Sequence, residues 1–225
     1  QPAAEILRLA DVAAVARGGV HVVLSPSARR RIEQALAVIE AILASDRQVY
    51  GVNTGFGLLK DIRIPRGQLE TLQLNLIRSH CAGVGSPLPP AAARALMLLR
   101  AHVLARGHSG VRPQVVETLL AHLNADLLPV VPEQGSIGAS GDLAPLSHLA
   151  LALLGEGEAT LRGERMPAQA ALEKAGIAPL RLGPKEGLAL INGTQFITAV
   201  GTLALLEAEE LAVAADIAGA CTLEA

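Results

Sequence analysis

The sequence predicts a mainly α-helical protein in which a mixed N-terminal portion is followed by part of a long helical bundle. Hydrophobic residues make up 51% of the 225 residues, whereas aromatic residues make up only 1%. The core is therefore built from leucine, valine, isoleucine and alanine, a composition that favours packed helices over a β-sandwich. A chain of this length can bury a substantial core, and we expect two domains, residues 1–108 and 109–225.

Charge and hydropathy argue against nucleic acid and membranes as binding partners. The formal net charge is -2 and basic residues are spread along the chain, so the basic patch of a nucleic-acid-binding protein is missing. The most apolar stretch, Ile197 to Leu206, is too short to span a membrane and predicts a buried helix. The first residues do not resemble a signal peptide, and two cysteines are too few for a disulfide framework, which favours a cytoplasmic protein.

The first clear helix is predicted to begin at Ser25, whose hydroxyl can cap it, with Pro26 in the first helical position. Apolar residues at helical spacing then mark one face from Ile32 to Leu43. Three glycines in the segment Tyr50 to Gly57 exclude a regular helix there. We therefore predict a shaped loop over this segment.

Further helices are predicted between breaks that are rich in glycine and proline. They cover residues 69–81, 91–106 and 113–123. The stretch 129–141 is again rich in proline and glycine, and a new helix opens near Asp142. Gly141 and Asp142 are thus expected at the N-terminus of a helix.

The remainder of the chain is predicted to hold a hairpin-like excursion and one short helix between Gly155 and Gly183. Asn192, Gly193 and Thr194 interrupt the pattern ahead of the last helix. That helical pattern still continues at Ala225, which we interpret as the mark of a truncated chain.

The glycine-rich segment from Gly135 to Asp142 allows several interpretations. It can be a plain connection into a helix that Asp142 caps. A phosphate cradle would need a Lys-Ser or Lys-Thr pair and a preceding strand, and both are missing. A serine hydrolase turn fits poorly, because the glycine after Ser140 comes one position early for G-x-S-x-G.

A fourth interpretation is chemical. In a strained turn, the nitrogen of Gly141 can attack the carbonyl carbon of Ala139, and the ring closes with loss of one water. Loss of a second water across the Ser140 side chain leaves a methylideneimidazolone, an electrophile that no unmodified side chain supplies. A helix that begins at this point would stabilise negative charge on the ring oxygen.

Four segments in order, residues 50–57, 78–80, 138–146 and 186–195, resemble the aromatic amino acid lyase and aminomutase family. The resemblance covers essentially the whole chain, although family members are more than twice as long. It implies that Ala139, Ser140 and Gly141 form the methylideneimidazolone and that Asp142 supports its formation. No external cofactor and no metal are implied.

The resemblance also implies roles for single residues. Tyr50 would be the catalytic acid and base that takes the proton from the β-carbon of the substrate, although it could also be an ordinary core tyrosine. Asn192 would contact the substrate and the ring, although it could be a turn residue. His80, in the pair Ser79-His80, resembles the histidine-specific branch of the family and would bind the substrate imidazole, although it could simply end its helix.

The reaction implied is the elimination of ammonia from L-histidine to give urocanate, by a homotetramer. An aminomutase, or a lyase for another aromatic amino acid, would keep the same motifs. A fragment without activity would keep the fold.

Overall fold

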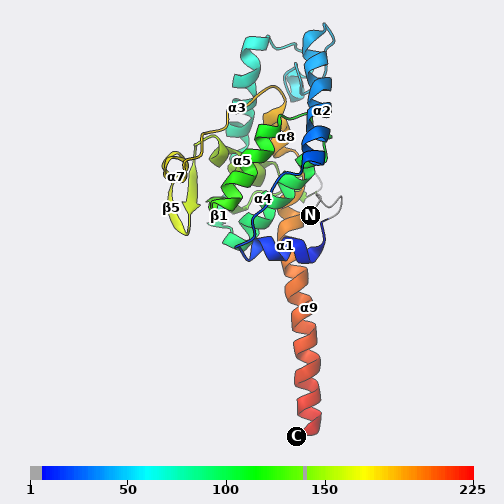
Figure 1. The fold of residues 1–225 in the computed structure, drawn as a ribbon, viewed down its shortest axis with the longest axis vertical. Coiled ribbons are helices and arrows are strands. Elements are labelled where there is room, and N and C mark those ends of the chain that lie inside the picture. Colours follow the sequence, from blue (N-terminus) through cyan, green and yellow to red (C-terminus); the bar gives the residue numbers. More distant parts are fainter. Residues whose placement is uncertain (1–6, 139–140) are drawn as a thin grey trace.

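The computed structural model describes residues 7–138 and 141–225 and consists mainly of helices, as the sequence predicts (Figure 1). The helices are α1 (Leu9–Ala16), α2 (Pro26–Ala44), α3 (Leu69–His80), α4 (Pro90–Ala105), α5 (Pro113–Asn124), α6 (Leu143–Leu153), α7 (Ala168–Ala175), α8 (Glu186–Ile191) and α9 (Gln195–Glu224), with short 3-10 turns η1 (Gly57–Leu59) and η2 (Arg66–Gln68). The strands are β1 (Val84–Pro87), β2 (Leu127–Pro129), β3 (Pro132–Gln134), β4 (Glu158–Leu161) and β5 (Glu164–Pro167).

The predicted helix boundaries agree with the structure. The Ser25 hydroxyl accepts a hydrogen bond from the Ala28 amide at 3.2 Å, and Pro26 occupies the first position of α2. The predicted helices over residues 69–81, 91–106 and 113–123 correspond to α3, α4 and α5. Local capping residues and proline positions therefore decide these boundaries.

Helix α1 was not expected from the sequence. It has only eight residues, and an isolated helix of that length is unstable in water. Its residues Val12, Val15 and Ala16 are buried, and the helix packs against α4. The tertiary contact with α4 stabilises α1, which explains why a local pattern did not reveal it.

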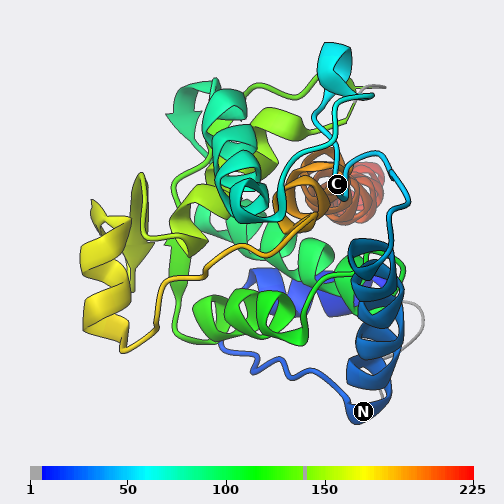
Figure 2. The same cartoon turned by 90° about the horizontal axis from the view of Figure 1, so that it is seen from above.

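Two small antiparallel sheets connect segments that are distant in the sequence. In the first, β1 pairs with β3, so the segment after α3 lies beside the segment before the glycine-rich loop. In the second, β2 pairs with β4 of the β4–β5 hairpin, with Leu128 opposite Thr160. This hairpin and α7 are the predicted excursion between Gly155 and Gly183, and they stand at one side of the molecule (Figure 2).

One hydrophobic core joins most of the helices. It includes the fully buried Leu96 of α4, Leu119 of α5 and Leu149 of α6. A second, smaller cluster packs α7 against the three-stranded sheet. The larger core contains residues from both sides of residue 108, and the division into domains 1–108 and 109–225 stays a prediction.

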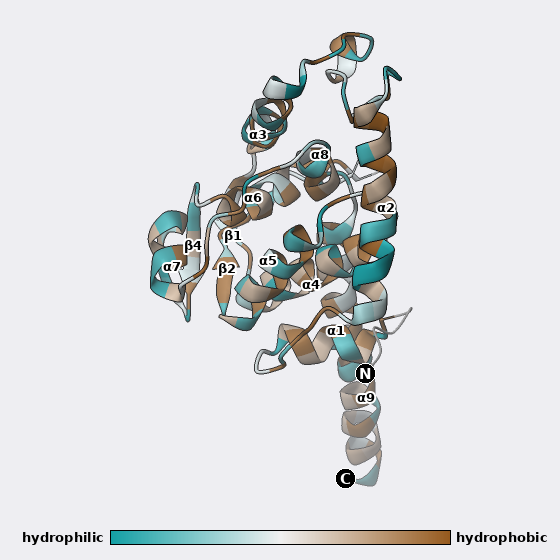
Figure 3. Ribbon diagram, turned by 45° about the horizontal axis from the view of Figure 1, so that its top comes forward, coloured by the Kyte–Doolittle hydropathy of each residue, from teal (hydrophilic) through white to brown (hydrophobic). Residues whose placement is uncertain are grey.

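Helix α9 projects away from the body of the molecule (Figure 1). Phe196 and Ala199, at its start, are buried, but Ile197 is 44% exposed and Val200 is 40% exposed. The prediction of a buried helix over residues 197–206 is therefore wrong for this chain. Only the start of α9 finds apolar partners, mainly on α4, while hydrophobic residues continue along its projecting part (Figure 3).

The segment Glu186–Glu224, which joins α8 and α9, is long and apolar enough to cross a membrane by length and composition. A third of its most apolar window is buried in this chain. The apolar stretch Ile197 to Leu206 makes up only ten of these residues. Core helices of multi-chain assemblies share the same length and composition, so this feature alone is weak evidence for a membrane.

Candidate active site

The glycine-rich loop before α6 ends at Gly141, the last residue of the predicted electrophile precursor, which directly precedes the N-cap residue of that helix. Ala139 and Ser140 lie outside the described residues. Gly141 is buried, and its φ of +102° lies in a region that favours glycine. A Cβ atom at this position would lie 3.2 Å from the carbonyl oxygen of Gly193, so the turn before α9 lies close to Gly141.

Asp142 occupies the N-cap position of α6, but its side chain does not cap that helix. The carboxylate is fully buried. Its Oδ1 accepts a hydrogen bond from the Ser136 hydroxyl at 2.5 Å, and its Oδ2 accepts one from the Ile197 amide at 3.0 Å. Ile197 is in the first turn of α9, where free amides and the helix dipole favour a negative charge. Asp142 thus stabilises the start of a different helix from the one expected.

Asn192 lies in the turn between α8 and α9 and is exposed. Its backbone N–H donates to the Leu188 carbonyl oxygen at 3.0 Å. The backbone N–H of Asp142 donates to the Gly193 carbonyl oxygen at 2.8 Å. The backbone that follows the precursor is therefore bonded directly to the turn that carries Asn192. A backbone hydrogen bond thus joins these two predicted parts of the site.

The same turn is bonded on its inner side to Arg100 of α4, which is 2% exposed. The guanidinium donates to Gln195 Oε1 at 2.5 Å, to the Asn192 carbonyl oxygen at 3.2 Å and to the Ala189 carbonyl oxygen. Burial lowers the pKa of Arg100 to about 10, which leaves it charged at neutral pH. A buried charge is costly unless it is hydrogen-bonded, and here backbone and amide oxygens bond Nη1 and Nη2, whereas Nε has no partner among the described residues.

Tyr50 lies in the predicted loop and is 57% exposed, so it is not a core tyrosine in this chain. Its ring meets Phe56 edge to face, with 6.1 Å between centroids. The loop is held by Asn53, whose side chain accepts from the Val49 amide at 2.8 Å and donates to the Arg47 carbonyl oxygen at 2.9 Å. Gly51 adopts a φ of +73°.

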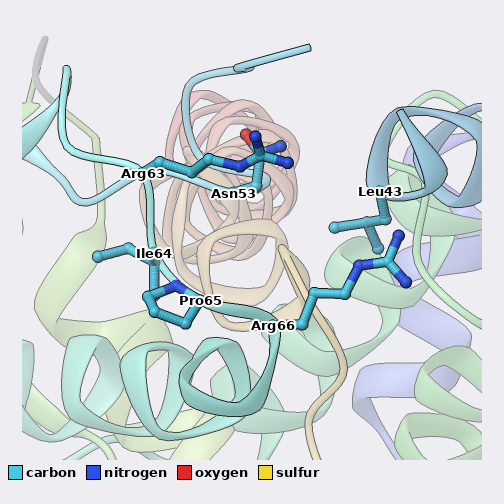
Figure 4. Close-up of a pocket in the computed structure, with 6 residues that line it drawn as sticks. All are labelled: Leu43, Asn53, Arg63, Ile64, Pro65 and Arg66. Carbon is cyan, nitrogen blue, oxygen red and sulfur yellow. The ribbon is translucent and has the colours of Figure 1, made fainter. Parts of the chain in front are cut away.

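The Tyr50 loop lies on α8. A Cβ atom at Gly51 would lie 2.6 Å from Leu188 Cδ2, so the loop backbone lies close to this side chain. The outer side of the loop borders an open pocket of about 340 Å³ (Figure 4). The pocket is lined by Leu43, Asn53, Arg63, Ile64, Pro65 and Arg66. It contains none of the predicted site residues, so we describe it as a neighbour of the loop.

His80 is the last residue of α3 and is partly buried. Its Nδ1 lies 2.8 Å from the Leu76 carbonyl oxygen and 3.1 Å from the Ser79 hydroxyl. A carbonyl oxygen only accepts, so this contact assigns the proton to Nδ1 and leaves Nε2 as an acceptor. His80 therefore ends its helix and also keeps one ring nitrogen that is able to bind a ligand.

Two further contacts tie α3 to the rest of the site. The Gln73 side-chain oxygen accepts from the Leu188 amide of α8 at 3.0 Å. Beyond the end of α3, the Gly83 amide donates to His148 Nε2 of α6 at 3.2 Å. Helix α3, which ends at His80, thus contacts both α6 and α8, and the Tyr50 loop contacts α8. Within the described residues, no hydrogen bond joins the side chains of Tyr50, His80 and Asn192 directly.

Cys81 follows His80 but does not suit nucleophilic chemistry. Burial, together with the nearby Glu156 carboxylate, raises the pKa of its thiol to about 11. The thiol is therefore protonated at neutral pH. Across residues 7–138 and 141–225, no group of three His, Cys, Asp or Glu side chains could hold a metal ion.

A family model described as "Aromatic amino acid lyase" matches residues 7–225. The chain belongs to this family. Histidine ammonia-lyase from Anaeromyxobacter dehalogenans is 57% identical over 98% of this chain, and histidine ammonia-lyase from Stigmatella aurantiaca is 56% identical over 98%. The chain spans 45% and 43% of the length of these two proteins, so it corresponds to less than half of each.

Solved structures of the aromatic amino acid lyase family have the same fold. Histidine ammonia-lyase from Trypanosoma cruzi matches with a TM-score of 0.85 and 46% identity, covering 92% of this chain and 40% of that one. Phenylalanine aminomutase from Pantoea agglomerans matches with a TM-score of 0.86 and 36% identity, covering 91% and 39%. These matches confirm the predicted helical fold and the predicted family.

The sequence did not reveal three polar residues whose side chains hydrogen-bond to the segments of the site, namely Gln73, Arg100 and Ser136. For Arg100 a signal existed, because it is a charged residue within an otherwise apolar helical stretch, Ala-Leu-Met-Leu-Leu-Arg-Ala. A charge at a core position needs a partner, but the sequence does not say which one. Its partners lie about 90 residues further along the chain.

Proposed function

We propose that the protein carrying this chain eliminates ammonia from L-histidine to give urocanate. The observation that carries the proposal is the bonded frame that links Gly141 and Asp142 to the turn of Asn192. The 57% identity to a histidine ammonia-lyase supports the choice of substrate. The Tyr50 loop contacts α8, and α3, which carries His80, packs against both α6 and α8. These contacts support a single site.

We infer that Ala139, Ser140 and Gly141 form a methylideneimidazolone. The residues around it fit this group: Gly141 has no side chain to obstruct a closing ring, and its φ of +102° is a turn conformation. The buried Asp142 carboxylate holds the backbone on the following side. The group supplies an electrophilic carbon that accepts the amine of the substrate.

The remaining roles follow from exposure and chemistry. The exposed Asn192 side chain binds the substrate. His80 Nε2 accepts a hydrogen bond from the imidazole N–H of L-histidine. Tyr50, which is 57% exposed, takes the proton from the β-carbon as its phenolate and is left as the neutral phenol. The amides at the start of α6 stabilise negative charge next to them.

We further propose a homotetramer in the cytoplasm, without nucleic acid or membrane partners. The exposed apolar residues along α9 support assembly with other chains, because such a surface is rare on a monomer. The division into residues 1–108 and 109–225 remains part of the proposal, with Tyr50 and His80 in the first part and the electrophile and Asn192 in the second.

An aminomutase is the second candidate. The match to a phenylalanine aminomutase with a TM-score of 0.86 favours keeping it, because the same frame serves both reactions. The two differ in outcome: a lyase releases ammonia, whereas a mutase returns the amine to the neighbouring carbon.

The test combines mass and absorbance. We expect the intact mass of the whole protein that carries this chain to be lower than its sequence mass by two waters, and the difference to disappear in Ser140→Ala. The same protein should convert L-histidine to a product with the ultraviolet absorbance of urocanate. A β-amino acid product would favour the aminomutase. Absence of any reaction with L-histidine would contradict the assigned substrate.

A further inference from the structure

Arg100 is a buried charged residue for which the reaction itself provides no role. It lies in the middle of α4 and is the largest fully buried side chain in the described structure. Its guanidinium donates to three oxygens, and all three belong to the end of α8, the turn after it or the start of α9. One side chain therefore spans the whole α8–α9 connection.

These bonds act on the turn that carries Asn192. The Ala189 and Asn192 carbonyl oxygens are at the C-terminal end of α8, where carbonyl groups lack helical partners and favour a positive charge. Gln195 is the first residue of α9, so its bond to Arg100 attaches the next helix to the same point. The guanidinium therefore contacts the end of α8, the turn and the start of α9 at the same time.

Gly193 lies between Arg100 and the backbone of Gly141 and Asp142. A Cβ atom at Gly193 would overlap Arg100 Nη1 and Gln195 Oε1, so the turn is packed directly on the guanidinium. On its other side, the Gly193 carbonyl oxygen accepts from the Asp142 amide at 2.8 Å and lies 3.2 Å from where a Gly141 Cβ atom would be. Arg100 is thus one residue removed from the backbone of the precursor.

We propose that Arg100 is a positioning residue that holds the Asn192–Gly193 turn against Gly141 and Asp142, so that the precursor closes into its ring and Asn192 faces the substrate. This inference rests on the proposed function. It goes beyond that function because Arg100 touches neither the reacting atoms nor the substrate. Lysine has a single charged nitrogen and cannot reach all three oxygens in a fixed plane, so it should replace arginine only in part.

The experiment measures ring formation in variants of the whole protein that carries this chain. In Arg100→Met we expect less than half of the folded molecules to have lost two waters, and in Arg100→Lys an intermediate fraction. The control is Leu104→Ala, a fully buried residue one turn further along α4. It should lower the melting temperature but leave every folded molecule cyclised. The cyclised fraction therefore separates positioning from general stability.

The kinetics give a second readout. We expect the turnover number of Arg100→Met per cyclised site to fall at least tenfold, because Asn192 is displaced, while Leu104→Ala keeps that of the wild type. Full cyclisation of Arg100→Met with a wild-type turnover number would overturn the inference. An unmodified wild-type protein would overturn the proposed function together with it.

If Arg100→Met yields no folded protein, the variant Gln195→Met is used to test the inference instead. It removes one of the three bonds, the one to Gln195 Oε1, and keeps the buried charge and a side chain of similar volume at position 195. A partial loss of cyclisation in soluble Gln195→Met supports the inference. A fully cyclised Gln195→Met protein with a wild-type turnover number overturns it.

Discussion

His122 and Asp142 show how differently two fully buried polar side chains behave. Asp142 has hydrogen-bond donors on both carboxylate oxygens. His122, on α5, has no partner on either ring nitrogen in the part of the chain that the structure describes. Burial lowers the pKa of His122 to about 4, so the ring is neutral at pH 7. An unpaired buried polar group costs about 1 to 3 kcal/mol.

The free energy of unfolding should therefore depend on the protonation of His122. In the unfolded chain a histidine titrates near pH 6.5, well above its value in the fold, so the unfolded chain binds more protons between pH 6.5 and 4. The free energy of unfolding keeps its full value above about pH 6.5. It decreases as the pH is lowered, by on the order of 3 kcal/mol at pH 4. His122→Leu should remove this loss and leave stability at pH 7 equal or higher, as measured by urea denaturation at pH 7, 5.5 and 4.5. Replacing the exposed His21 by leucine serves as the control, and a His122→Leu protein that loses as much stability as the wild type would contradict the prediction.

His80 carries the choice of substrate in our proposal. His80→Leu should reduce kcat/KM for L-histidine about 10- to 100-fold, because the substrate imidazole loses its acceptor, which corresponds to about 1.4 to 2.7 kcal/mol. Ser79→Ala removes the neighbouring hydroxyl and should change kcat/KM far less. Equal losses in both variants would show that His80 only ends its helix.

At the scale of elements, α8 depends on its neighbours because six residues cannot form a stable helix alone. Its first residue, Glu186, is 1% exposed. The carboxylate accepts from the Arg112 amide at 2.9 Å, from Arg112 Nε at 2.9 Å and Nη2 at 2.7 Å, and from the Gly183 amide at 2.6 Å. These bonds fix the start of α8 to the start of α5.

Glu186→Gln should lower the free energy of unfolding by about 2 to 3 kcal/mol, because it weakens four bonds to a buried charge while Arg112 stays partly solvated. Denaturant titration measures this change. The matched control is Glu158→Gln, which breaks the exposed pair with Arg165 and should change stability little. A Glu186→Gln protein as stable as Glu158→Gln would show that α8 is held by packing alone.

At the scale of the whole molecule, α9 combines a buried start with a long exposed apolar surface. Leu211 is 69% exposed and Ile217 is 60% exposed. Hydrophobic residues lie all round this helix, as expected for one that is enclosed on every side in its native assembly. The body of the molecule does not provide that enclosure for the projecting part (Figures 1 and 3).

We therefore expect the paired change Leu211→Glu and Ile217→Glu to convert the proposed tetramer to smaller species, since charges on this surface oppose burial. Light scattering coupled to size-exclusion chromatography measures the mass in solution. Val38→Glu, at an exposed apolar position of α2, is the control and should keep the native mass. An unchanged mass in the paired variant would exclude α9 from the interface.

The sequence by itself determined the helices α2 to α6, the two glycine-rich loops and the family. These features depend on residues close together in the chain, such as the cap at Ser25 or the motif around Gly141, so local chemistry suffices to predict them.

Only the tertiary structure decided which helix Asp142 stabilises, what Arg100 holds and where α9 is exposed. The Asp142 carboxylate bonds to an amide 55 residues away, and Arg100 bonds to a side chain 95 residues away. A polar residue at a buried position requires a hydrogen-bond partner, and this can be inferred from the sequence. Which of the many polar groups becomes that partner depends on the tertiary fold. The burial of α9 depends in the same way on which surfaces come together, and so it was predicted incorrectly.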